Sequence, residues 1–373
     1  MFKSVLVLGH ISGIRIEIHV SWLVIFALLM FALSAGFQQH YPDWSMAVVL
    51  VTSLLTILTF FASIVAHELG HSLVAIRRGV PVKAITLFIF GGVAQLSRDS
   101  ETARDEFWIA IAGPAVSFAL ALVFALLSGA TAAISEPLSV GLGWLALINF
   151  VVAVFNLIPG FPLDGGRVFR ALVWMFTGNA RTGMMAAVMG GRLVAYGLFG
   201  LGLWSMLALG NLIGGLWIMV IAWFLLNSAE ASGRHFDLSS RLHGIRAMDV
   251  TEPDVPLVAR NTPVDQWIEQ DVLRSGNRTG FVGERDQFLG LVTLSDARRI
   301  PRERWPHTPV EDIMTAVDKL VAVQPDTPIT ELLQLMSEKN LNQVPVMERS
   351  RLVGWIDRQR ILRTINIHLE LKA

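Results

Sequence analysis

The chain has 373 residues, of which 53% are hydrophobic and 16% are charged, and its mean hydropathy is +0.55. This composition is too apolar for an ordinary soluble protein of this length and favours a membrane protein. The 30 basic and 30 acidic residues balance, and no cluster of Lys and Arg interleaved with aromatic residues suggests a nucleic-acid partner. Cysteine is absent, which excludes disulfides and thiolate metal sites.

Six apolar stretches are long enough to cross a lipid bilayer, which requires about 20 residues per helix. They cover approximately residues 20–37, 46–76, 107–131, 140–158, 184–209 and 211–227. The connections on one side of these stretches hold basic residues, such as Lys3, Arg77 and Arg181, whereas the loops 38–43 and 131–138 hold none. Because positive loops stay in the cytoplasm, we expect a multi-pass protein of the cell membrane with both termini cytoplasmic.

The second stretch contains His67-Glu-Leu-Gly-His71, three ionisable groups where lipid-facing sequence should hold none. Residues four apart share a helix face, so the two imidazoles can bind one metal ion, with Glu68 beside it. Ionisable groups within a spanning helix are expensive and usually functional. The alternative is a pair of structural histidines that hydrogen-bond their neighbours, with Glu68 as a structural partner.

A catalytic zinc ion needs a third protein ligand and an open position for water. From Phe107 to Asn227 the acids are Glu136, in a loop without basic residues, and Asp164. Asp164 belongs to Asn156-Leu-Ile-Pro-Gly-Phe-Pro-Leu-Asp-Gly-Gly166, in which prolines end the fourth span and glycines permit a tight turn. We expect this loop to bring Asp164 to the histidines. The alternative role of Asp164 is the N-cap of a helix over 165–176.

These residues predict metal-assisted hydrolysis of an amide. With His67, His71 and Asp164 holding Zn²⁺, water would become a nucleophile near neutral pH. Glu68 would accept its proton and pass it to the leaving amine. Asn156 could donate a hydrogen bond to the carbonyl oxygen or to the developing oxyanion, or it could form an Asx turn before the proline.

The two motifs, in this order, resemble the site-2 protease family of intramembrane zinc metalloproteases over roughly residues 1–229. The resemblance implies that His67, His71 and Asp164 bind zinc, that Glu68 is the general base, and that Asn156 positions the substrate. It also implies an endopeptidase that cleaves transmembrane peptides or proteins inside the lipid bilayer.

Between the second and third spans, residues 81–96 are rich in β-formers and broken by glycine, which predicts a β-hairpin and not another span. A helical substrate must unwind before it is cleaved, and an exposed strand edge could hold the unwound segment. The alternative is a hairpin that only covers the hydrolytic site. Ala112-Gly113-Pro114 in the third span predicts a kink or a close helix contact.

From about residue 234 the pattern changes to that of a soluble α/β domain, which repeats with a period of roughly 60 residues. We therefore expect a membrane domain (1–229), a linker (230–243) and a cytoplasmic domain (244–373). The repeats resemble a tandem pair of CBS domains. This implies an adenine nucleotide such as ATP or AMP at Gly290-Leu-Val-Thr293-Leu-Ser-Asp296, whereas Asp357 and Arg360 replace the Thr and Asp in the second copy. A purely structural or dimerising module, and hence a homodimer, stays open.

The expected fold is thus a polytopic α-helical membrane protein with six transmembrane helices and a small β-hairpin insert, joined to a soluble α/β CBS pair. The expected function is that of an intramembrane zinc endopeptidase modulated by nucleotide at the CBS pair. The alternative class is a CBS-regulated metal or ion transporter, but transporters usually show internal repeats and ligands across both halves. The intact set of ligands and base also argues against a catalytically silent scaffold.

Overall fold

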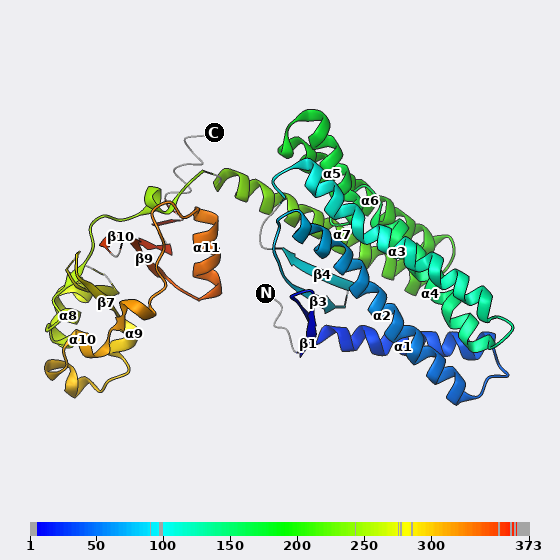
Figure 1. Ribbon diagram of the computed structural model, residues 1–373, viewed down its shortest axis with the longest axis horizontal. Coiled ribbons are helices and arrows are strands. Elements are labelled where there is room, and N and C mark those ends of the chain that lie inside the picture. Colours follow the sequence, from blue (N-terminus) through cyan, green and yellow to red (C-terminus); the bar gives the residue numbers. More distant parts are fainter. Residues whose placement is uncertain are drawn as a thin grey trace. The chain divides into compact units, whose positions relative to one another are not determined.

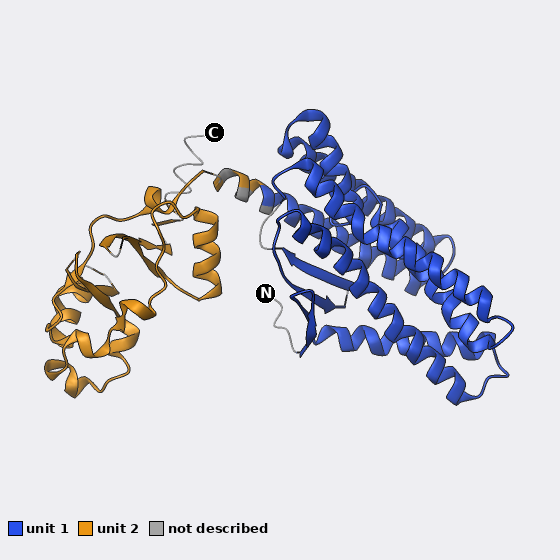
Figure 2. Cartoon of the chain, in the orientation of Figure 1, with its two compact units in different colours: residues 1–236 blue, residues 237–373 orange. Residues whose placement is uncertain are grey.

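The computed structural model describes residues 6–89, 91–96, 100–242, 244–274, 276, 278–284, 286–349, 351–358, 360, 361 and 363, with the backbone alone at 235, 238, 239 and 241. The chain divides into two compact units, residues 1–236 and 237–373 (Figure 2). Lys3, one of the basic residues from which the orientation is predicted, lies outside the described residues.

The first unit confirms the prediction of six membrane spans (Figure 1). Each is a single apolar helix, because only internal hydrogen bonds can satisfy a lone backbone segment in lipid. A shorter helix, α5 (Asp164–Thr177), lies between the fourth and fifth spans. The six spanning helices are α1 (Ser21–His40), α2 (Met46–Arg77), α3 (Ala103–Thr131), α4 (Glu136–Asn156), α6 (Ala180–Leu207) and α7 (Leu212–Leu242), of which the last is apolar as far as Arg234.

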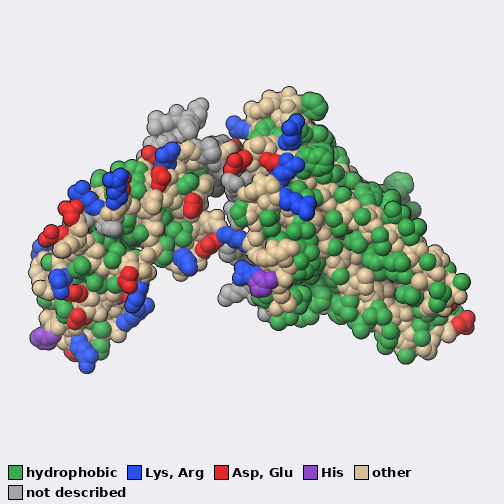
Figure 3. All heavy atoms as spheres, viewed as in Figure 1, with side chains coloured by type: hydrophobic (Ala, Val, Ile, Leu, Met, Phe, Trp, Pro, Cys, Tyr) green, Lys and Arg blue, Asp and Glu red, His purple; other side chains and the backbone are tan. Residues whose placement is uncertain are grey.

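Helix α3 packs against α2, α4 and α5, and so it forms one wall of the space in which α2 and α5 meet. On the face shown in Figure 3, hydrophobic side chains cover the helical unit, while most of its visible charged side chains gather at one end. This distribution is expected where lipid replaces water around the helices. Helix α7 continues through residues 230–242, so the stretch expected to be a linker is helical.

The predicted hairpin is present as β3 (Val82–Phe88) and β4 (Gly91–Leu96), but it is only half of a sheet. The N-terminal segment adds β1 (Leu6–Ile11) and β2 (Ile14–Ile18), and the strand order is β1-β2-β3-β4. Strand β2 runs parallel to β3, and the other two pairs are antiparallel. The alternation in Ile14-Arg-Ile-Glu-Ile18, after a Ser-Gly turn, is the signal for β2 that the sequence contains.

The sheet lies against the part of α2 that carries the histidines. Its isoleucines Ile14, Ile16 and Ile85 are buried and pack with Val65 and Leu69 of α2. Strand β4 is the outer strand, and no strand of the described residues pairs with its other edge. The sheet therefore places one strand edge close to the middle of the ionisable motif.

The second unit repeats one pattern, a helix followed by an antiparallel hairpin, and so confirms the repeat predicted from the sequence. The hairpin of β6 (Thr279–Gly283) and β7 (Phe288–Thr293) recurs as β9 (Gln343–Glu348) and β10 (Arg351–Asp357). Strands β5 (Leu257–Val258) and β8 (Thr315–Ala316) extend the first hairpin into a sheet of four. The α-helices of this unit are α8 (Val264–Trp267), α9 (Leu294–Ala297), α10 (Val310–Ile313) and α11 (Ile329–Glu338).

Short helices of other types complete the second unit. They are the 3₁₀ helices at Ala247–Val250, Arg302–His307 and Val317–Lys319, and a π-helix at Ile268–Leu273 that continues α8. The apolar core of each repeat is separate, and a third cluster containing Phe281 and Leu352 joins the two hairpins.

Candidate metal centre

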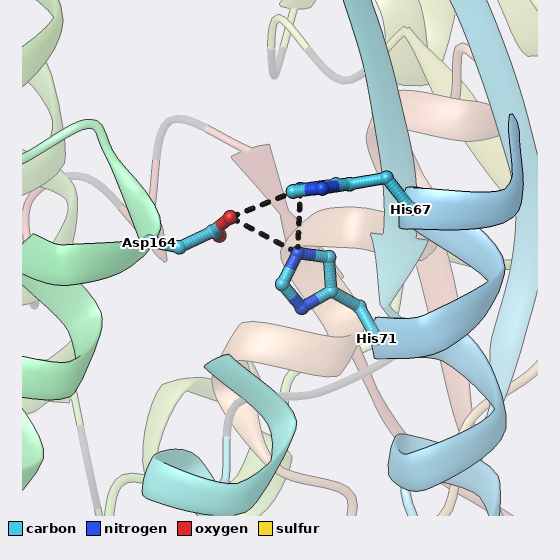
Figure 4. A group of neighbouring side chains, drawn as sticks. All are labelled: His67, His71 and Asp164. Carbon is cyan, nitrogen blue, oxygen red and sulfur yellow. Dashed lines mark hydrogen bonds and ion pairs between the residues drawn. The ribbon is translucent and has the colours of Figure 1, made fainter. Parts of the chain in front are cut away.

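The three predicted ligands meet at one point (Figure 4). His67 and His71 lie one turn apart on α2, and their Nε2 atoms are 3.2 Å from each other. The Oδ2 atom of Asp164, at the start of α5, is 3.1 Å from each of these nitrogens. Both histidines are buried, and Asp164 is largely so. Among the described residues, no other His, Asp or Glu joins this cluster.

Helix α3 holds the other nitrogen of each imidazole. Nδ1 of His71 lies 2.7 Å from the main-chain oxygen of Ile109, and Nδ1 of His67 lies 2.8 Å from Oγ of Ser117. A carbonyl oxygen only accepts, so Nδ1 of His71 carries a proton. In the neutral imidazole its Nε2 then holds a lone pair directed at the cluster. Such hydrogen bonds orient metal-ligating histidines in proteins.

The donor set fits a zinc ion. Lone pairs of two imidazoles and one carboxylate repel one another at such short distances unless a cation lies among them. Zinc bonds of about 2.0–2.2 Å in a tetrahedral site place neighbouring ligand atoms about 3.3–3.6 Å apart. The observed separations of 3.1 and 3.2 Å are close to these values. Three protein ligands leave one position for water or substrate, as in catalytic zinc sites.

Asp164 is set up as an anion. Its carboxylate, which lies 3.1 Å from Nε2 of both histidines, supplies the negative charge of the donor set. The expected alternative, an N-cap, is not what the structure contains. Leu163 occupies the N-cap position of α5, and Asp164 is the first residue of the helix, with its carboxylate turned to the histidines.

Close backbone packing fixes the loop before Asp164. A Cβ atom on Gly165 would lie 2.3 Å from the carbonyl group of Leu157, and one on Gly191 of α6 would lie 2.2 Å from the carbonyl oxygen of Phe161. The amide of Phe161 also donates to the carbonyl oxygen of Ala187 at 3.1 Å. Glycines at these positions therefore permit the contacts that hold the loop against α6 and set the start of α5.

Glu68 is partly buried and lies against β4. A Cβ atom on Gly92 would be only 2.6 Å from Cγ of Glu68 and 3.1 Å from its Oε1. The carboxylate of Glu68 makes no hydrogen bond or ion pair with any described residue. A partly buried carboxylate without a hydrogen-bond or ion-pair partner among the described residues costs stability, which speaks for a chemical role and against the structural alternative.

Asn156 is the last residue of α4 and is partly buried. Its side chain forms no hydrogen bond with the residues that the structure describes, so the alternative of an Asx turn is not observed. The amide is therefore free to bind a ligand. It stands at the beginning of the loop that ends with Asp164.

Sequence reasoning predicted Gly113 as part of a kink or a close helix contact, without its partner, and it missed Ser117 and Arg167 at this centre. Gly113 of α3 approaches the ligands closely, because a Cβ atom there would lie 2.1 Å from Nε2 of His71. Ser117 holds His67, and Arg167 of α5 is close enough to Glu68 for their charges to interact. The available signal was the four-residue spacing of Ile109, Gly113 and Ser117, which puts them on one face of α3. There they provide a carbonyl group, a position without a side chain and a hydroxyl group.

In the second unit, Thr293 and Asp296 bind each other. Oγ1 of Thr293 donates to Oδ2 of Asp296 at 2.6 Å, and the amide of Thr293 donates to the same oxygen at 3.0 Å. They form the reciprocal cap of the short helix α9. In the second copy, Asp357 instead accepts a hydrogen bond from Gln343, and Arg360 pairs with Glu252. The matching positions of the two repeats therefore differ both in their side chains and in the contacts that these side chains make.

Comparison with known proteins places both units. The chain matches Peptidase family M50 at residues 55–133 and 129–196, and the CBS domain at residues 310–367. A Synechocystis protein named as a zinc metalloprotease is 33% identical over 367 residues, covering 96% of this chain and 94% of that protein. A Mycobacterium tuberculosis protein named in the same way is 32% identical over 371 residues, covering 98% and 94%. A solved site-2 protease from Methanocaldococcus jannaschii is 30% identical and covers 61% of this chain and 94% of its own, with a TM-score of 0.42.

Proposed function

The chain belongs to Peptidase family M50, the site-2 zinc metalloproteases, and carries a CBS domain, and from this premise we propose that it cleaves membrane-embedded peptides within the bilayer. The observation that carries the proposal is the convergence of Asp164 with His67 and His71 of a membrane-spanning helix, beside Glu68, whose carboxylate has no hydrogen-bond or ion-pair partner among the described residues. A multi-pass membrane protein with a hydrolytic centre at this depth has membrane-embedded segments as its natural substrates.

Each residue has a defined task in this proposal. Nε2 of His67, Nε2 of His71 and the carboxylate of Asp164 hold the zinc ion, which supplies a water nucleophile near neutral pH when it is bound. Glu68 takes a proton from that water and gives it to the leaving amine. The amide of Asn156 donates to the carbonyl oxygen of the peptide and steadies the charge that develops there.

Strand β4 is the proposed support for the substrate. It is the outer strand of its sheet, and Gly92 within it touches Glu68. A segment that pairs with this edge exchanges its helical hydrogen bonds for strand hydrogen bonds, so its amides are never left unsatisfied in lipid. Its carbonyl groups then pass beside the general base.

The distribution of basic residues supports an orientation of the protein in the membrane. Basic residues flank the ends of the helices where α2 finishes and α5 begins, as at Arg77, Arg78 and Arg167. We propose that this end faces the cytoplasm, together with both termini and the second unit. His71 is six residues before Arg77, or about 9 Å along the helix, so the centre lies nearer the cytoplasmic surface.

We also propose that the CBS pair binds an adenine nucleotide through Thr293 and Asp296 and modulates the protease. The geometry of the first copy supports this, because both side chains stand at the end of β7 where they also order α9. Asp357 and Arg360 occupy the matching positions of the second copy, which is why the proposal is limited to one site. A homodimer through the CBS pair is part of the same proposal.

The experiment compares zinc content and peptide cleavage in the purified full-length protein and two variants. The substrate is a single-span peptide of about 25 residues, made of leucine and alanine with a central pair of glycines that lets its helix unwind. Glu68→Gln should retain zinc and lose cleavage, by about a hundredfold or more, because it keeps the shape but cannot accept a proton. Asp164→Asn should lose both zinc and cleavage, since it removes the anionic ligand.

The two variants test different parts of the proposal. Full activity in Glu68→Gln would exclude this residue as the base. Stoichiometric zinc in Asp164→Asn would show that this carboxylate is not a ligand of the metal. Zinc-dependent cleavage that is restricted to soluble peptides would contradict the intramembrane substrate.

A further inference from the structure

The first unit contains a cavity of about 460 Å³, and its lining includes Arg167, three residues after Asp164 on α5. Its walls come from the end of β4, the loop before Asp164, and the helices α3, α5, α6 and α7 around them. The residues used below are Leu96, Glu106, Phe161, Arg167, Arg170 and Phe236. Nothing in the proposed reaction uses this space.

Two of the charges in the cavity neutralise each other. NH1 of Arg170 lies 3.2 Å from Oε1 of Glu106, and both residues are buried, at 8% and 2% exposure. The guanidinium of Arg170 also stacks over the ring of Phe236, 4.7 Å from its centroid. This arrangement fixes Arg170 as part of the wall.

Arg167 is different, because no carboxylate of the described residues is within ion-pair range of it. It is partly buried, it lies one turn after Asp164 on α5, and its charge is close enough to act on Glu68. Among the described residues, Arg167 is thus the charged group of the cavity that has no ion-pair partner, and apolar side chains such as Leu96 and Phe161 form the neighbouring walls. A partly buried, unpaired cation gains most from an anionic partner that enters with little water.

Strand β4 gives the distance between the cavity and Glu68, the proposed general base. Gly92 touches Glu68, and Leu96 lines the cavity. These positions are four residues apart, or about 13 Å along a strand, and an even spacing puts them on the same face. A peptide paired with the outer edge of β4 continues this alternation. If one of its residues lies at Glu68, the residue four positions away points into the cavity.

We propose that this cavity is a specificity pocket for an acidic side chain of the substrate, located about four residues from the cleaved bond. Arg167 forms the ion pair with that carboxylate, and the apolar walls receive its stem and neighbouring residues. The inference rests on the proposed peptidase function and goes beyond it by naming a substrate class. The volume of the cavity is in the range of pockets that bury small ligands.

The test is a positional scan in the leucine–alanine peptide. A single Glu is moved from five residues before the cleaved bond to five residues after it, and each peptide has a Gln counterpart at the same position. Products are located by mass spectrometry. For the wild-type protein we expect the ratio of kcat/KM for Glu over Gln to peak about four residues from the bond, at about tenfold, because hydrogen bonds to charged groups are stronger than those to neutral ones.

Variants of Arg167 identify the partner of the acidic side chain. Arg167→Gln should bring the ratio to about one, Arg167→Lys should keep most of it, and Arg167→Glu should invert the preference in favour of Lys at the same position. The matched control is Arg181→Gln, which removes the same charge from an exposed site at the start of α6 outside the cavity. It should leave the ratio at its wild-type value.

Several results would overturn the pocket. One is a flat scan in a protein that cleaves the peptide, and another is a Glu preference that survives Arg167→Glu. A third is a cleavage rate that is higher in phosphatidylglycerol nanodiscs than in phosphatidylcholine nanodiscs and that depends on Arg167 but not on Glu in the peptide. This result would assign the cavity to a lipid phosphate. Absence of any cleavage that depends on Glu68 would instead refute the proposed function.

Discussion

Ser117 is a single hydroxyl on the face of α3 that meets α2, and its Oγ is the partner of Nδ1 of His67. Ser117→Ala would leave that nitrogen without an acceptor in a site that water does not reach easily, because Ser117 is only 1% exposed. Loss of such an orienting partner typically costs about 10- to 100-fold in metal affinity. We predict a loss of this size, measured as zinc affinity by competition with a chelator.

Ser72 offers a matched control for this prediction. It is fully buried, it follows His71 directly, and its Oγ has no hydrogen-bond partner among the described residues. Ser72→Ala therefore removes an equivalent atom beside a ligand without removing an interaction. Equal zinc affinities for the two alanine variants would show that the contact of Ser117 does not orient His67.

At the scale of elements, β4 sets the position of the general base. Gly92→Ala would put a methyl group within 2.6 Å of Cγ of Glu68, so the glutamate must move. Misplacement of a catalytic group by about 1 Å can cost about a hundredfold in rate. We predict a fall in kcat of about tenfold or more with zinc content unchanged. Val93→Ala is the control, because Val93 is exposed on the opposite face of the strand.

The elements also show what the sequence could and could not predict. The spans and the motif of α2 follow from local patterns, namely apolar length and a four-residue spacing. The parallel pairing of β2 with β3 joins segments more than 60 residues apart, and no local pattern encodes it. The same is true of Gly113, whose closeness to His71 depends on how α3 packs against α2. A glycine before a proline predicts a kink or a close helix contact, but it does not identify the residue that the glycine contacts.

At the scale of the whole molecule, helix α7 joins the membrane-spanning protease unit to the unit that contains the CBS domain. Leu242 at the end of α7 belongs to the apolar core of the second repeat. Phe236, six residues earlier, packs on Arg170 in the first unit. A proposed nucleotide signal in the second unit therefore has a covalent, helical route toward α5, the helix that begins with Asp164.

The last prediction concerns the proposed nucleotide site. In the full-length protein, Thr293→Ala combined with Asp296→Ala should weaken ATP or AMP binding at least about tenfold in calorimetry, because hydrogen bonds to ribose and phosphate are lost. The same change removes the cap of α9, which costs about 1 kcal/mol of stability. Thr293→Ser keeps both the hydroxyl and the cap, so it should bind like the wild type. If the double variant stays folded by circular dichroism and binds nucleotide with unchanged affinity, these two residues do not form the site.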